Sequence, residues 1–141
     1  MSALRRSKPE ATQLGTFDLF SDLSPADLGK IAAAGQVVTL PANWGFISEG
    51  TPGDTFYIVL SGSVRVAAQG KHLADLEAGT VLGETGLLSG RLRNATVSTI
   101  TPSVLLHIGK DDFDRLMRDV PAFRQTLESA SAQRSASNTE G

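Results

Sequence analysis

The chain contains no cysteine among its 141 residues, which excludes disulfide bonds, thiolate catalysis and zinc–thiolate sites. No apolar run approaches the roughly 18 residues that a membrane-spanning helix needs, and no apolar segment follows Arg5 and Arg6 as in a signal peptide. The formal net charge is −2, so the composition offers no basic surface of the kind that binds nucleic acid. These absences predict a cytoplasmic protein that binds neither a membrane nor nucleic acid.

What is present is the composition of an ordinary globular domain. Hydrophobic residues make up 40% and charged residues 20% of a chain long enough for one core. We expect a flexible, polar and basic arm over residues 1–14, one domain over residues 15–128, and a flexible tail over residues 129–141. The tail is rich in serine and alanine and carries no apolar stripe.

The hydrophobic pattern predicts helices at both ends of that domain and strands between them. Ser24-Pro25 is a typical helix start, with the serine as cap, and Gly35 is expected to end that helix in a left-handed conformation. From Gln36 the pattern changes to alternation, with turn residues at intervals of eight to ten positions. Such short, evenly spaced strands are typical of an antiparallel sandwich, roll or barrel.

A helical pattern returns at Lys110 and, after Pro121, continues into a second helix. The expected buried residues of these two helices are Phe113, Leu116, Met117, Val120, Phe123 and Leu127. Asp111 and Asp112 could suggest an acid/base pair, but they lie in the first turn of the helix, where acidic residues are favourable. The pattern as a whole therefore predicts an α+β fold that is mainly β.

The most informative segment runs from Leu82 to Val97. Gly83 and Gly86 bracket Glu84, and the residues that follow are enough for about one helical turn, whose first N–H groups are free to bind an anion. Arg93 then begins the next alternating run, and a guanidinium can bind two phosphate oxygens at once. A carboxylate repels phosphate, so Glu84 is better explained as an acceptor for a ribose hydroxyl. The segment therefore predicts a binding site for a sugar and a phosphate in cyclic form.

Other interpretations of these residues were weighed. A Gly-Glu-x-Gly sequence alone could be a solvated turn, and Arg91 could bind the phosphate in place of Arg93, although a surface position explains Arg91 better. His72 and His107 lack the spacing of metal ligands, so they are interpreted as a turn residue and a strand residue. No metal site and no catalytic residue is predicted.

At this segment the chain resembles the cyclic nucleotide-binding domain of the catabolite activator protein, of cAMP-dependent kinase regulatory subunits and of cyclic-nucleotide-gated channels. The phosphate-binding cassette of that family has the pattern G-E-x-[AG]-L-L, four residues, then R-x-A-[TS]. The residues of this chain that match it are Gly83, Glu84, Gly86, Leu87, Leu88, Arg93, Ala95 and Thr96. The resemblance extends over about residues 17–127, although Trp44-Gly45 departs from the family's usual glycine-acidic pair.

The resemblance implies an antiparallel β-roll of about eight strands flanked by N-terminal and C-terminal helices, in agreement with short alternating strands. It also implies roles within the cassette: the Gly83 backbone and Glu84 side chain hold the ribose 2′-hydroxyl, and the backbone N–H groups of Gly86 and Asn94 hold the phosphate with Arg93. The expected site comprises Gly83, Glu84, Thr85, Gly86, Leu87, Arg93, Asn94 and Ala95. Asn94 replaces the small residue usual in the family, which leaves the choice between cAMP and cGMP open, with cAMP favoured.

No helix-turn-helix, kinase, cyclase or channel segment accompanies the predicted domain. The expected function is therefore a non-enzymatic, monomeric sensor of cyclic nucleotide that changes conformation at its C-terminal helices and regulates an effector protein in trans. It needs no cofactor. The sequence could be a complete protein, which its ending slightly favours, or the excised module of a larger one. The alternative function is a β-roll interaction module that does not bind nucleotide.

Overall fold

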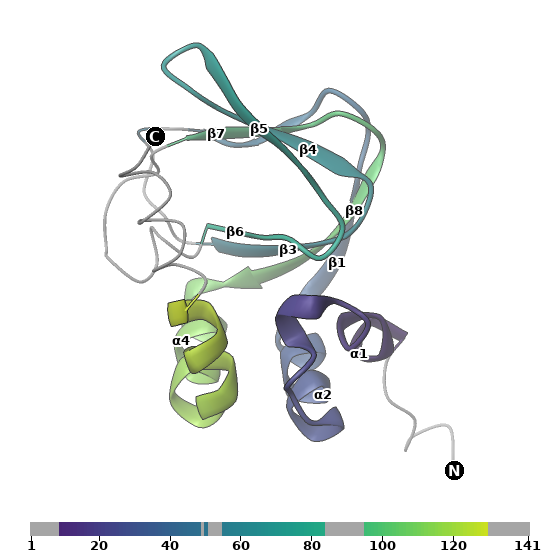
Figure 1. The fold of residues 1–141 in the computed structure, drawn as a ribbon, viewed down its shortest axis with the longest axis vertical. Coiled ribbons are helices and arrows are strands. Elements are labelled where there is room, and N and C mark those ends of the chain that lie inside the picture. The colour runs from purple at the N-terminus through teal and green to yellow at the C-terminus, as the bar shows by residue number, and fades with distance from the viewer. Residues whose placement is uncertain (1–8, 49, 51–54, 84–94, 130–141) are drawn as a thin grey trace.

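The computed structural model describes residues 9–48, 50, 55–83 and 95–129. Within them, eight antiparallel strands form two four-stranded sheets, and the helices lie together on one side of the pair (Figure 1). The strands are β1 (Gln36–Leu40), β2 (Gly45–Ile47), β3 (Thr55–Ser61), β4 (Ser63–Ala68), β5 (Lys71–Glu77), β6 (Val81–Leu82), β7 (Thr96–Thr99) and β8 (Ser103–Gly109). The predicted α+β, mainly β fold with a β-roll is therefore confirmed.

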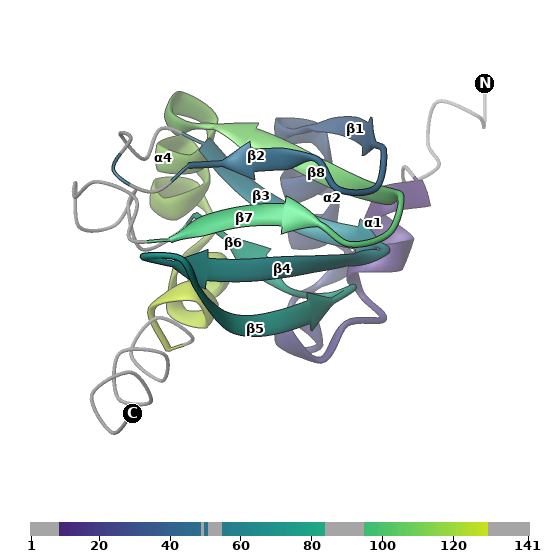
Figure 2. The ribbon, with the colours of Figure 1, turned by 90° about the horizontal axis from the view of Figure 1, so that it is seen from above.

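The sheet next to the helices, here called the helix-side sheet, has the strand order β1-β8-β3-β6. The other, here called the outer sheet, has the order β2-β7-β4-β5 and is seen face-on in Figure 2. The helical elements are α1 (Pro9–Leu14), the 3₁₀ helix η2 (Asp18–Phe20), α2 (Pro25–Ala34) and α4 (Lys110–Asp119). Residues 121–129 are also helical, which confirms the second helix predicted after Pro121.

Two apolar cores correspond to the two faces of the helix-side sheet. The helix-side core lies between this sheet and the helices, and its largest members are Phe20, Phe56, Phe113, Phe123, Leu14, Ile31, Ile58, Leu106, Ile108 and Leu127. The inner core lies between the two sheets and contains Ile47, Val59, Val64, Leu82, Val97 and Leu105. Because successive strand residues point to opposite faces, neighbouring residues of β3 and β8 supply both cores.

The helix-side core has an aromatic centre. The ring of Phe56, from β3, lies 5.1 Å from that of Phe113 and 5.9 Å from that of Phe123, and the latter two rings are 6.0 Å apart. Tilted and edge-on pairs at these distances add about 0.5–1.5 kcal/mol each beyond the area that they bury. The C-terminal helical residues thus pack directly against β3, an inner strand of the helix-side sheet.

The predicted start of α2 is confirmed. The Ser24 hydroxyl accepts a hydrogen bond from the Asp27 backbone N–H at 3.1 Å. Leu28 and Ile31, which lie on one face of the helix, are buried. The prediction for Gly35 is wrong, because its φ of −121° and ψ of 175° are extended, not left-handed. Its small size matters instead: a Cβ there would come within 2.9 Å of the Ile108 and Leu106 side chains.

The expected flexible arm needs a correction over part of its length. Residues 9–14 form α1, in which Ala11 and Leu14 are buried, and the Gln13 side-chain amide donates to the Leu60 carbonyl at 2.6 Å. This stretch is therefore packed on the roll. Residues 1–8 and 130–141 lie outside the described residues, and the domain limits stay a prediction.

Replacing Ser24 with alanine should lower the free energy of unfolding by about 1 kcal/mol, because one N–H at the start of α2 loses its acceptor. Chemical denaturation measures this difference. Ser24→Asn is the matched control, since asparagine also caps helices and should keep nearly all of the stability. Equal losses for both variants would contradict a capping role.

Candidate functional site

The structure describes two of the eight predicted site residues, Gly83 and Ala95. The other six, Glu84, Thr85, Gly86, Leu87, Arg93 and Asn94, lie outside the described residues, as does Arg91. Their predicted roles therefore stay predictions. What the structure provides is the frame that carries both ends of the cassette.

Gly83 and Ala95 continue strands of different sheets at the same end of the roll. Gly83 follows β6 in the helix-side sheet, where Leu82 is opposite Tyr57, and Ala95 precedes β7 in the outer sheet, where Thr96 is opposite Ala67. Both strand ends lie on the left in Figure 1. We call this end, defined by Tyr57, Leu82, Gly83, Ala95 and Thr96, the roll mouth. Gly83 and Ala95, the described residues at the two ends of the cassette, thus belong to different sheets.

The backbone at Gly83 has a φ of +90°, which L-residues with a side chain rarely adopt. The chain can therefore turn out of β6 directly into the cassette only because residue 83 is glycine. Gly83 is also half-buried, so its main chain lies close to neighbouring groups. Both properties agree with a glycine that lets a ligand approach the backbone.

The space between the two sheets is mostly apolar. Side chains from both sheets are partly buried against the inner core, namely Leu40, Phe46, Tyr57, Val66 and Leu76, and of these Tyr57 lies at the roll mouth. A mostly apolar space between the sheets suits a ligand that is an anion at one end and a flat, weakly polar base at the other. Sequence reasoning placed none of these residues at the site. The alternation of the strands indicated which side chains face inward, but not which end of each strand meets the cassette.

Among the residues that the structure describes, the charged groups with displaced pKa values lie on the surface, away from the roll mouth. A hydrogen bond from His72 and a second from Arg65 lower the pKa of Asp75, with Nε2 of His72 at 2.8 Å and Nε of Arg65 at 3.2 Å from Oδ1. Hydrogen bonds to Asp114 and Asp119 similarly raise the pKa values of Lys110 and Arg118. Exposed pairs of this kind contribute little stability. They form no site for a nucleotide.

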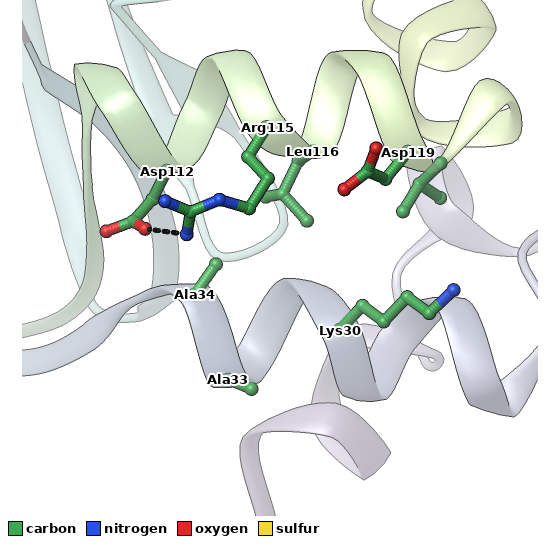
Figure 3. Close-up of a pocket in the computed structure, with 8 residues that line it drawn as sticks. Lys30, Ala33, Ala34, Asp112, Arg115, Leu116 and Asp119 are labelled. Atoms are coloured by element: carbon green, nitrogen blue, oxygen red, sulfur yellow. Dashed lines mark hydrogen bonds and ion pairs between the residues drawn. The ribbon is translucent and has the colours of Figure 1, made fainter.

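A groove of about 310 Å³ runs between α2 and α4 (Figure 3). Its lining combines small and apolar residues with a few charges, namely Lys30, Ala33, Ala34, Asp112, Arg115, Leu116, Asp119 and Val120. Arg115 is bound to Asp112, with Nη1 2.8 Å from Oδ1. The groove belongs to the interface of two helices, and its lining contains none of the predicted site residues. Its relevance is that any shift of α4 against α2 would change it.

Among the described residues, no group of three metal-binding side chains is present. The helices in the same part of the chain also lack the length and apolar character needed to cross a bilayer.

A comparison with family models decides the assignment, because the cyclic nucleotide-binding domain model matches residues 37–120, more than half of the chain. The chain belongs to the cyclic nucleotide-binding domain family. Domains of this family are typically regulatory and not catalytic, and they bind cAMP as a ligand. The resemblance found in the cassette is thereby confirmed at the level of the family.

Curated relatives include the regulatory subunit of cAMP-dependent protein kinase from Emericella nidulans, 32% identical over 132 residues, covering 92% of this chain and 32% of the relative. A cyclic nucleotide-gated potassium channel from Mesorhizobium japonicum is 35% identical over 116 residues, covering 82% of this chain and 32% of the channel. The chain therefore spans about a third of the length of these two relatives.

Solved structures agree on the fold. The catabolite activator protein of Thermus thermophilus superposes with a TM-score of 0.78 at 27% identity, covering 86% of this chain and 59% of that one. The regulatory subunit of a cAMP-independent protein kinase A from Trypanosoma brucei gives a TM-score of 0.80 at 24% identity, covering 93% and 49%. At that identity the second likeness shows the fold alone.

Proposed function

We propose that this chain is a cyclic nucleotide sensor that binds cAMP at the roll mouth and regulates a partner protein in trans through its C-terminal helices. The observation that carries the proposal is the cassette pattern from Gly83 to Thr96, complete at both charged positions, in a chain whose sheets place the two ends of that cassette at one end of the roll. The positive φ of Gly83 and the mostly apolar space between the sheets support it. The protein would act as a cytoplasmic monomer without enzymatic activity.

Calorimetric titration of the purified chain with cAMP and with cGMP tests the binding step. We expect binding of both, with cAMP tighter. A ligand at one hundred times its dissociation constant stabilises the folded state by about 2.7 kcal/mol. For a chain of this size that should raise the melting temperature by several degrees. No heat and no thermal shift with either nucleotide would refute the proposal.

The alternative, an interaction module without nucleotide binding, has one observation in its favour. A structure described as belonging to a cAMP-independent kinase shares this fold closely, so the fold by itself does not define the ligand. The cassette is what separates the two functions, because both Glu84 and Arg93 are present in this chain. The same titration therefore discriminates between them.

A route for transmission follows from contacts in the helix-side sheet. Tyr57, opposite Leu82 at the entrance to the cassette, is adjacent in β3 to Phe56, and the Phe56 ring contacts Phe113 and Phe123. A packed aromatic cluster does not deform continuously. If β6 were displaced, α4 and the helical residues 121–129 would therefore have to shift to a new packing arrangement. The groove between α2 and α4 would change with them.

Hydrogen exchange should therefore show ligand-dependent protection in two separate regions, residues 83–96 and residues 110–130. The first reports capture of the nucleotide and the second reports re-seating of the helices. Strand β1, at the far edge of the helix-side sheet, is the internal control and should change little. Protection confined to the first region would mean that binding is not transmitted, and a role in sequestering the nucleotide would replace the sensor.

A further inference from the structure

His107 occupies an unusual place for an ionisable residue. Its neighbours in β8, Leu106 and Ile108, belong to the helix-side core, so alternation turns His107 toward the space between the sheets. Its ring makes a T-shaped contact with Tyr57, at 5.4 Å between centroids, and Tyr57 packs against the inner core. His107 is half-buried. An imidazole therefore faces the mostly apolar space between the two sheets.

The contact is part of a row of rings that spans the roll mouth. Phe46, from β2 of the outer sheet, meets Tyr57 edge-on at 5.1 Å, and Tyr57 meets His107 in the same manner. The row thus crosses from one sheet to the other. Tyr57, in the middle of this row, belongs to the roll mouth, and His107 is at one end of the row.

The polar atoms of His107 have no partner within the described chain. An imidazole carries at least one N–H donor in either protonation state, yet His107 makes no hydrogen bond or ion pair with a described residue. His72 is the opposite case, because it is exposed and its Nε2 lies 2.8 Å from Asp75. Because His107 is only half-buried, its ring nitrogens remain open to a partner. Its place at the mouth suggests a partner that arrives from outside.

The position of His107 relative to the cassette identifies that partner. His107 is opposite Tyr57, and Tyr57 is opposite Leu82, which directly precedes Gly83. Two strand spacings of about 4.8 Å separate His107 from the entrance to the cassette. His107 is therefore close to the place where a nucleotide bound at the roll mouth would enter.

We propose that His107 is a ligand-facing residue of the nucleotide site, whose ring N–H donates a hydrogen bond to a sugar or phosphate oxygen of the bound cyclic nucleotide. The edge-on contact with the Tyr57 ring sets the orientation of the imidazole for this hydrogen bond. The inference rests on the proposed nucleotide binding and adds to the cassette a binding group from a distant strand.

Proton NMR tests the contact directly, because the chain has only two histidines. On addition of cAMP, the ring resonances of His107 should shift and show nuclear Overhauser contacts to ribose protons, whereas those of His72 should stay in place. Shifts at the Gly83 and Ala95 amides without any change at the His107 ring would overturn the inference while leaving nucleotide binding intact. A protein in which neither the amides nor the rings respond would overturn both.

Calorimetry on variants distinguishes a direct contact between His107 and the nucleotide from a role of His107 in the stability of the fold. His107→Leu removes the donor and should weaken cAMP binding about three- to tenfold, the range of one neutral hydrogen bond. His107→Gln retains an N–H donor and should recover part of that loss, and His72→Gln is the matched control, expected to match the parent. The unliganded His107→Leu protein should melt no lower than the parent, since it removes an unpartnered polar group. Equal affinity for His107→Leu and the parent would refute the contact.

Discussion

Arg93→Ala should weaken cyclic nucleotide binding by about two to three orders of magnitude. In the proposed site the guanidinium is the charge partner of the cyclic phosphate, and removing one member of a buried ion pair costs about 3–5 kcal/mol. Each 1.4 kcal/mol corresponds to about a factor of ten in affinity. Calorimetric titration with cAMP measures the loss, and thermal unfolding without ligand checks that the variant is folded.

Two further variants make this test specific. Arg93→Lys keeps the charge but loses the two-pronged contact with phosphate oxygens, so its affinity should fall between those of the parent and the alanine variant. Arg91→Ala, two residues upstream, is the matched control and should bind like the parent. Binding by Arg93→Ala within threefold of the parent would refute the assignment, and Arg91 would become the candidate.

Helices α2 and α4 and their buried faces were predictable because their signals are local. Ser24 caps a helix through a bond to a residue three positions away, and Phe113 and Leu116 mark one face of α4 at helical spacing. The strands followed from alternation and turn residues. Patterns of this kind depend on neighbours in sequence, so the sequence alone carries them.

The features that were missed depend on residues far apart in the chain. Helix α1 has six residues, too few to be stable by itself, and it is held by burial of Ala11 and Leu14 and by the bond from Gln13 to Leu60, 47 positions away. Gly35 was expected to end α2 in a left-handed conformation, whereas the space that a side chain at this position would need is filled by side chains of β8. The tertiary contacts decide both cases.

The site shows the same division. The cassette is a contiguous pattern, so its residues could be named from the sequence and its family recognised. His107 was interpreted as an ordinary strand residue, because nothing near it in sequence shows that β8 lies beside β3 or that Tyr57 lies beside Leu82. Only the strand register brings these residues to the roll mouth.

Glu84→Gln should distinguish nucleotides by their sugar, with the loss of affinity for cAMP about ten- to a hundredfold. The proposed carboxylate accepts a hydrogen bond from the ribose 2′-hydroxyl, and a hydrogen bond to a charged group contributes about 1.5–3 kcal/mol. A 2′-deoxy cyclic nucleotide already lacks that hydroxyl. The variant should therefore lose much less affinity for the deoxy ligand.

A double-mutant cycle of protein and ligand measures this difference. Four titrations, of the parent and of Glu84→Gln with cAMP and with its 2′-deoxy analogue, give a coupling free energy that cancels effects common to both ligands. We expect the two changes to be clearly non-additive, because each removes one side of the same hydrogen bond. Equal losses for the two ligands would mean that Glu84 shapes the cassette without touching the ribose, and discrimination of the sugar would then have to come from another polar residue near the roll mouth, for which His107 is our candidate.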